Sequence, residues 1–235
     1  MQVPRQRLGR WIDNFSVHHG APQATLDGDE LTLTSPDGAV AVIRTPYGPV
    51  VPTEVAVTDP VTAVLDHMAV DRMVAVVLAR KGGHAVGVFH GERLMLSKVG
   101  GSYVQGRTKA GGWSQQRYAR RRENQATQAA ARASEDAVRV LVEQFAELVD
   151  QLREEAAETG TELATTDTTV VALRCGGDRE MCERILADPR LADLAPLWQP
   201  PVIHQVGDPR LRVLQDFADQ TNAVRIGLND QARLR

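Results

Sequence analysis

Residues 73–97, MVAVVLARKGGHAVGVFHGERLMLS, decide the fold of this 235-residue chain. The stretch starts with Met73–Leu78, which is continuously apolar and β-prone, as expected for a strand covered on both faces. Two glycine-containing turns follow, and further β-prone runs lie between and after them, at residues 85–89 and 93–97. The stretch therefore predicts three consecutive antiparallel strands, each joined to the next by a short turn.

Downstream of this meander, residues 114–158 contain neither Pro nor Gly and predict one long helix. Its second half repeats apolar residues at spacings of three and four, which is typical of a helix that packs on a core. The residues of this stripe are Val138, Leu141, Phe145, Leu148 and Leu152. The first half is rich in Ala and Arg, so we expect its first turns to extend beyond the core or to lie against something polar.

The C-terminal sequence alternates between strand and helix patterns. Residues 168–173 predict a buried strand, and Asp178 is placed to cap a helix that ends near Leu186. A short strand at residues 202–203 and a helix after Asp208 complete the pattern. Three antiparallel strands followed by this alternation predict an α/β (α+β) fold, in which helices flank a mixed sheet.

The first sixty residues are rich in turns and differ in character from the rest. Two β-prone runs, residues 31–34 and 39–43, flank a Ser-Pro-Asp-Gly turn and predict a hairpin. Residues 10–15 fit either a short helix or a docking strand. We therefore divide the chain into a small β-rich N-terminal extension or subdomain, residues 1–60, and a main domain, residues 61–235.

Composition excludes several classes of protein. No apolar run approaches the length of a transmembrane helix, and the first residues lack the apolar region of a secretory signal. The two cysteines, Cys175 and Cys182, fit no disulfide framework, which favours reduced structural thiols and a cytoplasmic location. None of the six histidines has metal-binding spacing, and no phosphate-binding glycine motif or nucleophile elbow is present. We therefore expect no cofactor, no metal and no membrane association.

Charge is unevenly distributed along the chain, whose formal net charge is −3. The thirty residues between Glu92 and Glu123 contain eight Lys or Arg and no Asp or Glu. A compact basic zone on an otherwise acidic protein is typical of a site that binds a polyanion. The alternative is a basic helix face that is simply solvated.

The basic zone centres on residues 106–122, GRTKAGGWSQQRYARRR, where a glycine-rich loop runs into the predicted long helix. Glycine allows the backbone to approach a ligand closely. Arg and Lys neutralise phosphates, and Trp stacks on a base. Glutamine offers a neutral donor and acceptor that can position a water or a ribose hydroxyl. Together these residues predict an interface for an RNA end rather than for a duplex.

This stretch resembles the Gly-Gly-Gln loop and following helix in the middle domain of eukaryotic and archaeal class I release factors, of the form Gly-Gly-Gln-Ser-Ala-x-Arg-Phe-x-Arg-x-Arg. The residues that match are Gly111, Gly112, Ser114, the Arg117-Tyr118 step, Arg120 and Arg122. Weaker matches are the predicted strand with its glycine turn at residues 170–177 and the Asp188-Pro-Arg-Leu element. This resemblance spans roughly residues 70–225. More closely, the chain resembles the Vms-like release factors of actinobacteria.

The resemblance implies an RNase H-like domain that hydrolyses peptidyl-tRNA on large ribosomal subunits carrying stalled nascent chains, in ribosome rescue and quality control. Trp113 stands where the release-factor loop has its catalytic glutamine. In the Vms group the loop is Gly-Ser-Gln or similar, so Ser114-Gln115 aligns with its Ser-Gln pair. Gln115 is then the first candidate to position the attacking water, and Gln116 the second. Trp113 either anchors the loop or replaces the working glutamine.

Two groups of residues make up the expected site. The catalytic group comprises Gly111, Gly112, Trp113, Ser114, Gln115 and Gln116. The RNA-binding group, which would contact rRNA of the large ribosomal subunit and peptidyl-tRNA, comprises Arg107, Lys109, Arg117, Arg120, Arg121 and Arg122. Any one of these arginines could instead form an intramolecular salt bridge.

Two other functions remain open at this point. One is a tRNA-cutting nuclease, although a metal-dependent nuclease needs a carboxylate cluster that we do not find in the sequence. The other is a noncatalytic ribosome-binding or RNA-binding module.

Overall fold

The computed structural model describes residues 1–51, 53–101, 114–198 and 203–233, with the backbone alone at residues 55, 114–119, 121 and 122. By its internal contacts the chain forms two compact units. The first unit comprises Met1–Asp71 together with Asp219–Arg235, and the second comprises Arg72–Ala218. Each unit is built around a five-stranded sheet.

The sheet of the second unit is mixed, as the sequence predicts, and has the strand order β7-β6-β5-β8-β9. Strands β5, β6 and β7 pair antiparallel in sequence order, whereas β8 pairs parallel with β5, and β9 pairs parallel with β8. The strands are β5 (Met73–Arg80), β6 (Gly83–His90), β7 (Arg93–Gly101), β8 (Val170–Gly177) and β9 (Ile203–His204). The antiparallel meander is thereby confirmed, as is the class of a mixed sheet flanked by helices.

Strand β5 is buried on both faces, which explains its continuously apolar sequence. Met73, Ala75 and Val77 belong to a large core cluster on one side of the sheet. Val76 and Leu78 belong to a smaller cluster on the other side. The smaller cluster is completed by residues of α8 (Leu211–Gln215) and by the aromatic ring that follows this helix.

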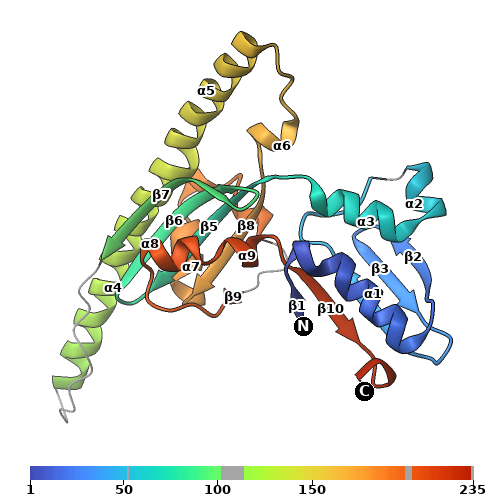
Figure 1. The fold of residues 1–235 in the computed structure, drawn as a ribbon. Coiled ribbons are helices and arrows are strands. Elements are labelled where there is room, and N and C mark those ends of the chain that lie inside the picture. The colour runs from blue at the N-terminus through green and yellow to red at the C-terminus, as the bar shows by residue number, and fades with distance from the viewer. Residues whose placement is uncertain (52, 102–113, 199–202, 234–235) are drawn as a thin grey trace. The chain divides into compact units, whose positions relative to one another are not determined.

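The predicted long helix lies along the face of the sheet that carries the larger core cluster (Figure 1). It comprises α4 (Ser114–Val138), a π-helical segment (Arg139–Glu143) and α5 (Gln144–Thr159). Buried or half-buried side chains recur every four residues, at Ala133, Ala137, Leu141, Phe145 and Val149. A 3.6-residue period would rotate such a row around the helix by about 40° per step. The wider π turn reduces this rotation, so the row drifts less around the helix.

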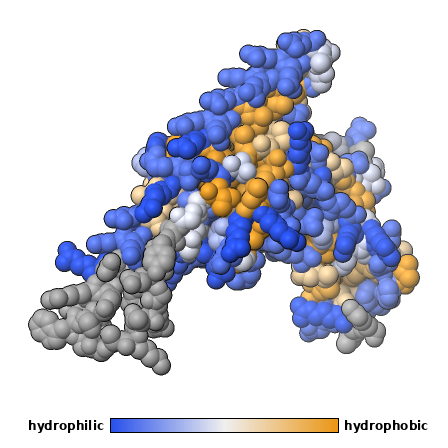
Figure 2. Space-filling model, turned by 60° about the vertical axis from the view of Figure 1, so that its left-hand side comes forward, coloured by the Kyte–Doolittle hydropathy of each residue, from blue (hydrophilic) through white to orange (hydrophobic). Residues whose placement is uncertain are grey.

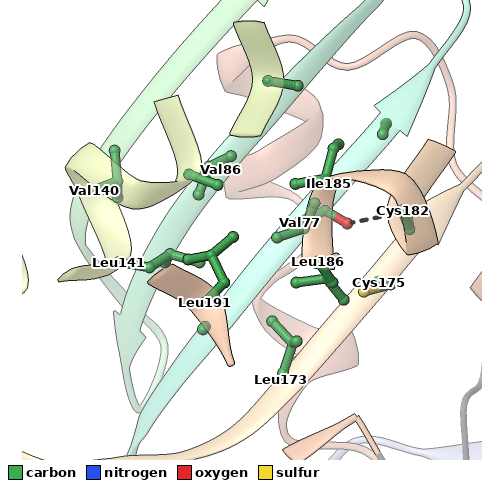
Figure 3. Close-up of a cluster of buried hydrophobic side chains, with 14 of the residues drawn as sticks. Val77, Val86, Val140, Leu141, Leu173, Cys175, Cys182, Ile185, Leu186 and Leu191 are labelled. Carbon is green, nitrogen blue, oxygen red and sulfur yellow. Dashed lines mark hydrogen bonds between the residues drawn. The ribbon is translucent and has the colours of Figure 1, made fainter. Parts of the chain in front are cut away.

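Helix α7 (Arg179–Leu186) and the helical turn Pro189–Leu191 close the core between the long helix and the sheet. Figure 3 shows Val77 of the sheet, Leu141 of the long helix and Ile185 of α7 converging in this core. Tight packing of this kind makes the core sensitive to the loss of a single side chain.

The two cysteines lie in the same core, and both are free and buried. The Cys182 thiol donates to the carbonyl oxygen of Val77 at 3.9 Å (Figure 3). The hydrogen bond to Cys182, together with burial, raises the pKa of the Cys175 thiol far above its ordinary value. A thiol that stays protonated is a poor nucleophile, so Cys175 is structural.

The turn from β8 into α7 follows the sequence prediction. Gly177 has a φ of +100°, and a Cβ at this position would lie 2.2 Å from the carbonyl oxygen of Ala79, so only glycine fits. Asp178 caps α7, because its carboxylate accepts a hydrogen bond from the backbone N–H of Met181 at 3.2 Å.

The first unit is an antiparallel sheet with the strand order β1-β10-β4-β3-β2. Its strands are β1 (Gln2–Val3), β2 (Gln23–Asp27), β3 (Glu30–Thr34), β4 (Val40–Arg44) and β10 (Val224–Leu228), and its helices are α1 (Leu8–His19), α2 (Glu54–Thr58) and α3 (Pro60–Ala69). Residues of α1 and α3 share one core with alternate residues of β3, β4 and β10. The sheet therefore buries one face, as antiparallel sheets commonly do.

The predicted hairpin is confirmed by β3 and β4, which pair antiparallel around the Pro-Asp-Gly turn. Residues 10–15 are helical, because Leu8, Ile12 and Phe15 place three buried side chains on one face of α1. The compact units do not divide the chain at residue 60, since α3 packs in the first core and β10 returns to pair with β1 and β4. The division into a β-rich extension or subdomain, residues 1–60, and a release-factor-like catalytic domain, residues 61–235, stays a prediction. No helix among the described residues is long and apolar enough to cross a membrane.

Leu173 provides a test of the shared core, because its side chain is fully buried between β8 and the helices. We expect Leu173→Ala to lower the free energy of unfolding by about 2–5 kcal/mol, since it removes buried methyl groups and leaves a cavity. Leu211→Ala is the control, because Leu211 is 46% exposed and its truncation should cost within about 0.5 kcal/mol. Urea unfolding followed by circular dichroism measures both, and equal costs would contradict the assignment of this core.

Candidate nucleic-acid interface

The predicted site divides at Ser114, which is the first residue of α4. Arg107, Lys109, Gly111, Gly112 and Trp113 lie outside the described residues. The other predicted residues lie on the first turns of this helix: Ser114, Gln115, Gln116, Arg117, Arg120, Arg121 and Arg122. Strand β7, which ends at Gly101, and helix α4 are therefore the two described elements that flank residues 102–113.

The first turns of α4 extend beyond the sheet (Figure 1). Among the described side chains of this helix, Arg120, Glu123 and Asn124 are exposed, and the first buried one is Ala129. Figure 2 shows a mostly hydrophilic outer surface along the long helix, with hydrophobic side chains gathered on its inner side. The backbone of the first turns thus extends beyond the core, which is one of the two arrangements that the composition predicts.

The first acidic residue of α4 is paired with a residue of α7. Arg184 donates from Nη2 to Glu123 Oε1 and to Glu180 Oε1, each at 2.7 Å. The hydrogen bonds to Glu123 and then to Glu180 raise the pKa of the Arg184 guanidinium. The carboxylate of Glu123 is thereby directed toward Arg184 of α7. In this position it interferes less with the binding of an external anion to the basic first turns of α4.

Three consecutive residues of α4 bond to three different elements. Ser134 Oγ donates to the carbonyl oxygen of Ile185 at 3.2 Å, in α7. Glu135 accepts two hydrogen bonds from the Arg190 guanidinium, at 2.7 and 3.2 Å. Asp136 Oδ2 accepts from Nε2 of His84 at 2.9 Å, in β6. Successive side chains on a helix point about 100° apart, so these three contacts restrain the helix from three directions.

Arg190 joins Glu135 to Asp188 in a charged network. The guanidinium donates to both carboxylate oxygens of Asp188, from Nε at 3.0 Å and from Nη2 at 2.8 Å. These bonds lower the pKa of Asp188 to about 2, and the Arg190 side chain also lowers the pKa of Glu135. The Asp-Pro-Arg-Leu element noted in the sequence thus has a structural role, because it holds the helical turn Pro189–Leu191 against α4.

His84 is the buried residue of this region that sequence analysis does not single out. Its side chain is 7% exposed, and it bonds to Asp136, whose side chain is 17% exposed. His84 is the register partner of Gly100 in β7, and a Cβ on Gly100 would lie 2.2 Å from Cε1 of the imidazole. The ring therefore lies directly against the backbone of Gly100, where any side chain would collide with it.

No group of three or more His, Cys, Asp or Glu side chains suited to a metal ion occurs among the described residues. His84 and Asp136 form a pair, not a ligand set, and the carboxylates of the Arg190 network are already bonded to that guanidinium. The described part of the region thus offers cations, hydrogen-bond donors and a rigid helix.

Comparison with known proteins covers the second unit and extends into the C-terminal segment of the first unit. Residues 72–227 match the family model described as Actinobacteria/chloroflexi VLRF1 release factor, which is more than half of the chain. Among solved structures, the crystal structure of the archaeal translation termination factor aRF1 matches with a TM-score of 0.41 and 13% sequence identity, over 98% of this chain and 72% of that chain. No curated protein matches the chain.

The Asp188–Arg190 contact predicts a defined acid sensitivity. Because the pKa of Asp188 is lowered from 3.8 to about 2 in the folded protein, the contact stabilises the fold above its ordinary pKa. That contribution is lost as the pH falls from about 4 through about 2. We expect the stability difference between wild type and Asp188→Asn to stay constant above about pH 5 and to shrink below about pH 4.

Asparagine still caps the following turn, so Asp188→Asn removes the charge and leaves the backbone contact. Asp193→Asn is the matched control, since Asp193 is exposed and carries the same charge. Urea unfolding at several pH values measures both variants, and a stability difference that grows on acidification would contradict the lowered pKa of Asp188.

Proposed function

Because this chain belongs to the Actinobacteria/chloroflexi VLRF1 release factor family, we propose that it is a peptidyl-tRNA hydrolase that frees stalled nascent chains from large ribosomal subunits. A release factor has a role in translation termination or rescue, and ester hydrolysis at the tRNA end is the finer step of this proposal. The observation that supports it best is the extent of the family match. Residues 72–227 include the whole glycine loop and the basic start of α4.

Hydrolysis of peptidyl-tRNA requires little from the protein beyond correctly placed groups. An aminoacyl ester is already activated, so hydrolysis requires a water held in line and donors for the developing oxyanion. Neutral groups suffice for both tasks, and Gln115 at the start of α4 is our first candidate to hold the water, followed by Gln116. Gly111 and Gly112 would let the backbone approach the ester, with Trp113 and Ser114 completing the loop.

Basic residues on both sides of these groups would hold the RNA. Arg107 and Lys109 would contact backbone phosphates beside the ester. The arginines on the helix would contact phosphates along its first turns: Arg117, Arg120, Arg121 and Arg122. The partners are then peptidyl-tRNA and rRNA of the large subunit, and the place of action is the cytoplasm. The mixed sheet of the second unit is compatible with the RNase H-like domain that the resemblance implies.

Gln115→Ala tests the catalytic assignment. We expect a loss of peptide release of about 10²-fold or more, because the water loses the group that positions it, with binding to large subunits retained. The measurement is release of labelled peptide from purified large subunits carrying peptidyl-tRNA, at saturating protein. Gln128→Ala is the matched control, because Gln128 is an exposed glutamine farther along the same helix.

The products of this assay distinguish the rival functions. Free peptide with intact tRNA supports hydrolysis, whereas peptide attached to a shortened tRNA identifies a nuclease. Binding with no product identifies a noncatalytic module. Release by Gln115→Ala at the wild-type rate would remove Gln115 from the mechanism.

The double variant Arg120→Glu with Arg121→Glu tests the RNA contact. We expect weaker binding to large subunits and a slope of log affinity against log salt that is smaller in magnitude by up to about 2, since about one unit is lost per phosphate contact. Arg132→Glu with Arg139→Glu is the control, because it changes the charge of the same long helix equally at exposed positions nearer the core. Filter binding over a salt series measures both, and equal slopes in all three proteins would show that the helix start is not an RNA surface.

A further inference from the structure

We propose that Ser134, Glu135 and Asp136 form a clamp that sets the direction of α4, and that His84 is the positioning residue of this clamp. The functional part of this inference rests on the proposed function, in which the start of α4 carries the groups that contact peptidyl-tRNA. Its structural part, the control of helix direction by His84, is independent of that function.

The length of α4 makes its direction important. Asp136 lies 22 residues beyond Ser114 on the same helix, which corresponds to about 33 Å at 1.5 Å per residue. A rotation of only about 2° at the clamp would move Ser114 by about 1 Å. A displacement of about 1 Å in a group that positions a reactant can cost about 10²-fold in rate. The site therefore depends on contacts far from it.

His84 has the contacts that such control requires. Its Nε2 donates to Asp136 on the helix at 2.9 Å, and its ring lies against Gly100, next to the last residue of β7. These are the two described elements that flank residues 102–113. The buried imidazole of His84 thus contacts both β7, which precedes this segment, and α4, which follows it.

The other two contacts cannot replace His84. Ser134 bonds to α7 and Glu135 bonds to Arg190, and the Glu135 and Arg190 side chains are 65% and 47% exposed. Solvent weakens an exposed ion pair, and neither of these two contacts joins α4 to the sheet. The His84–Asp136 pair is largely shielded from solvent, so its hydrogen bond is weakened less by water. It is also the contact of the clamp that joins α4 to the sheet.

The chain contains its own matched control. His90 lies on the same strand, β6, and its Nε2 donates to Asp167 Oδ1 at the same distance of 2.9 Å. This pair lies at the opposite end of the strand, because His90 is the register partner of Arg93, whereas Gly83, beside His84, is the partner of Gly101. Asp167 belongs to α6 (Thr165–Thr168), so the second pair does not touch α4.

The experiment compares His84→Ala with His90→Ala on two readouts. The first is peptide release from large subunits carrying peptidyl-tRNA. We expect His84→Ala to lower the rate at saturating protein by about tenfold or more, with the dissociation constant for the subunits changed less than about twofold. His90→Ala should release peptide within about twofold of wild type. His84→Gln, which keeps a donor to Asp136, should recover most of the rate.

The second readout does not depend on the function. Spin labels at Ser97→Cys and Asn124→Cys, both exposed, report the distance between β7 and the outer part of α4, and the two native cysteines are buried. We expect His84→Ala to broaden or shift this distance distribution and His90→Ala to leave it unchanged. If His84→Ala does not fold, Asp136→Ala breaks the same bond from the more exposed side and gives the same comparison.

The outcomes separate the two proposals. An unchanged distance distribution in His84→Ala, or equal losses of release in His84→Ala and His90→Ala, would overturn the clamp. If wild type releases no peptide, the proposed function fails, and the clamp is judged on the distance distribution alone.

Discussion

The two-sided burial of strand β5 is the constraint on which the second unit depends. From Val74 to Ala79 no side chain of this strand is exposed, so each face of the sheet must be covered along its centre. The cover on one face is the long helix, whose inner surface is lined with alanines such as Ala129, Ala133 and Ala137. Small side chains let the helix approach the sheet closely, so this part of the helix is held against the sheet.

The free start of α4 follows from that contact. A helix longer than the sheet it covers must extend past the sheet edge, and α4 does so at its N-terminal end, where Ala129 is the first buried residue among the described side chains. A helix keeps its shape without tertiary support better than a loop does, since its backbone hydrogen bonds are internal. The projecting turns can therefore hold the exposed Arg120 away from the sheet, in a position that suits the proposed contact with a polyanion.

The fold was predictable from the sequence where local patterns specify it. The meander, the long helix, the Asp178 cap and the hairpin each have a periodicity or a turn residue of their own. The contribution of β10 to the first sheet and the bond from His84 to Asp136 join residues far apart in sequence, and no local pattern reports such pairs. The π-helical segment lies between these cases. Buried or half-buried side chains recur every four residues through it, from Ala133 to Val149, but the apolar spacings of three and four in the sequence do not reveal this regularity.

For the candidate site, the sequence indicates which residue types are present, and the described structure adds the contacts that hold α4 in place. The proposed catalytic residues at 111–116 could be suggested from the sequence because a glycine loop and a basic helix stand together in one stretch. The positioning residues were not recognisable, since Ser134, Glu135 and Asp136 look like any polar turn of a surface helix. Their roles depend on which element each side chain meets, and that is set by the packing of α7 and β6 around α4.

Acidic and basic residues occupy different parts of α4, and this separation relates the anchoring of the helix to its proposed contact with RNA. No acid precedes Glu123 on this helix, and the acids at positions 123, 135 and 136 each meet a partner on another element of the same unit. Acidic side chains on α4 thus attach the helix to its own protein, while the turns before Glu123 carry only positive charge among their ionisable groups. If these acids were spread over the whole helix, they would neutralise the surface that we propose meets RNA, and they would leave the helix less firmly held. The order of charges along α4 therefore meets two requirements, attachment of the helix to the protein and a basic surface at its start. It can meet both because the anchoring part and the projecting part of α4 do not overlap.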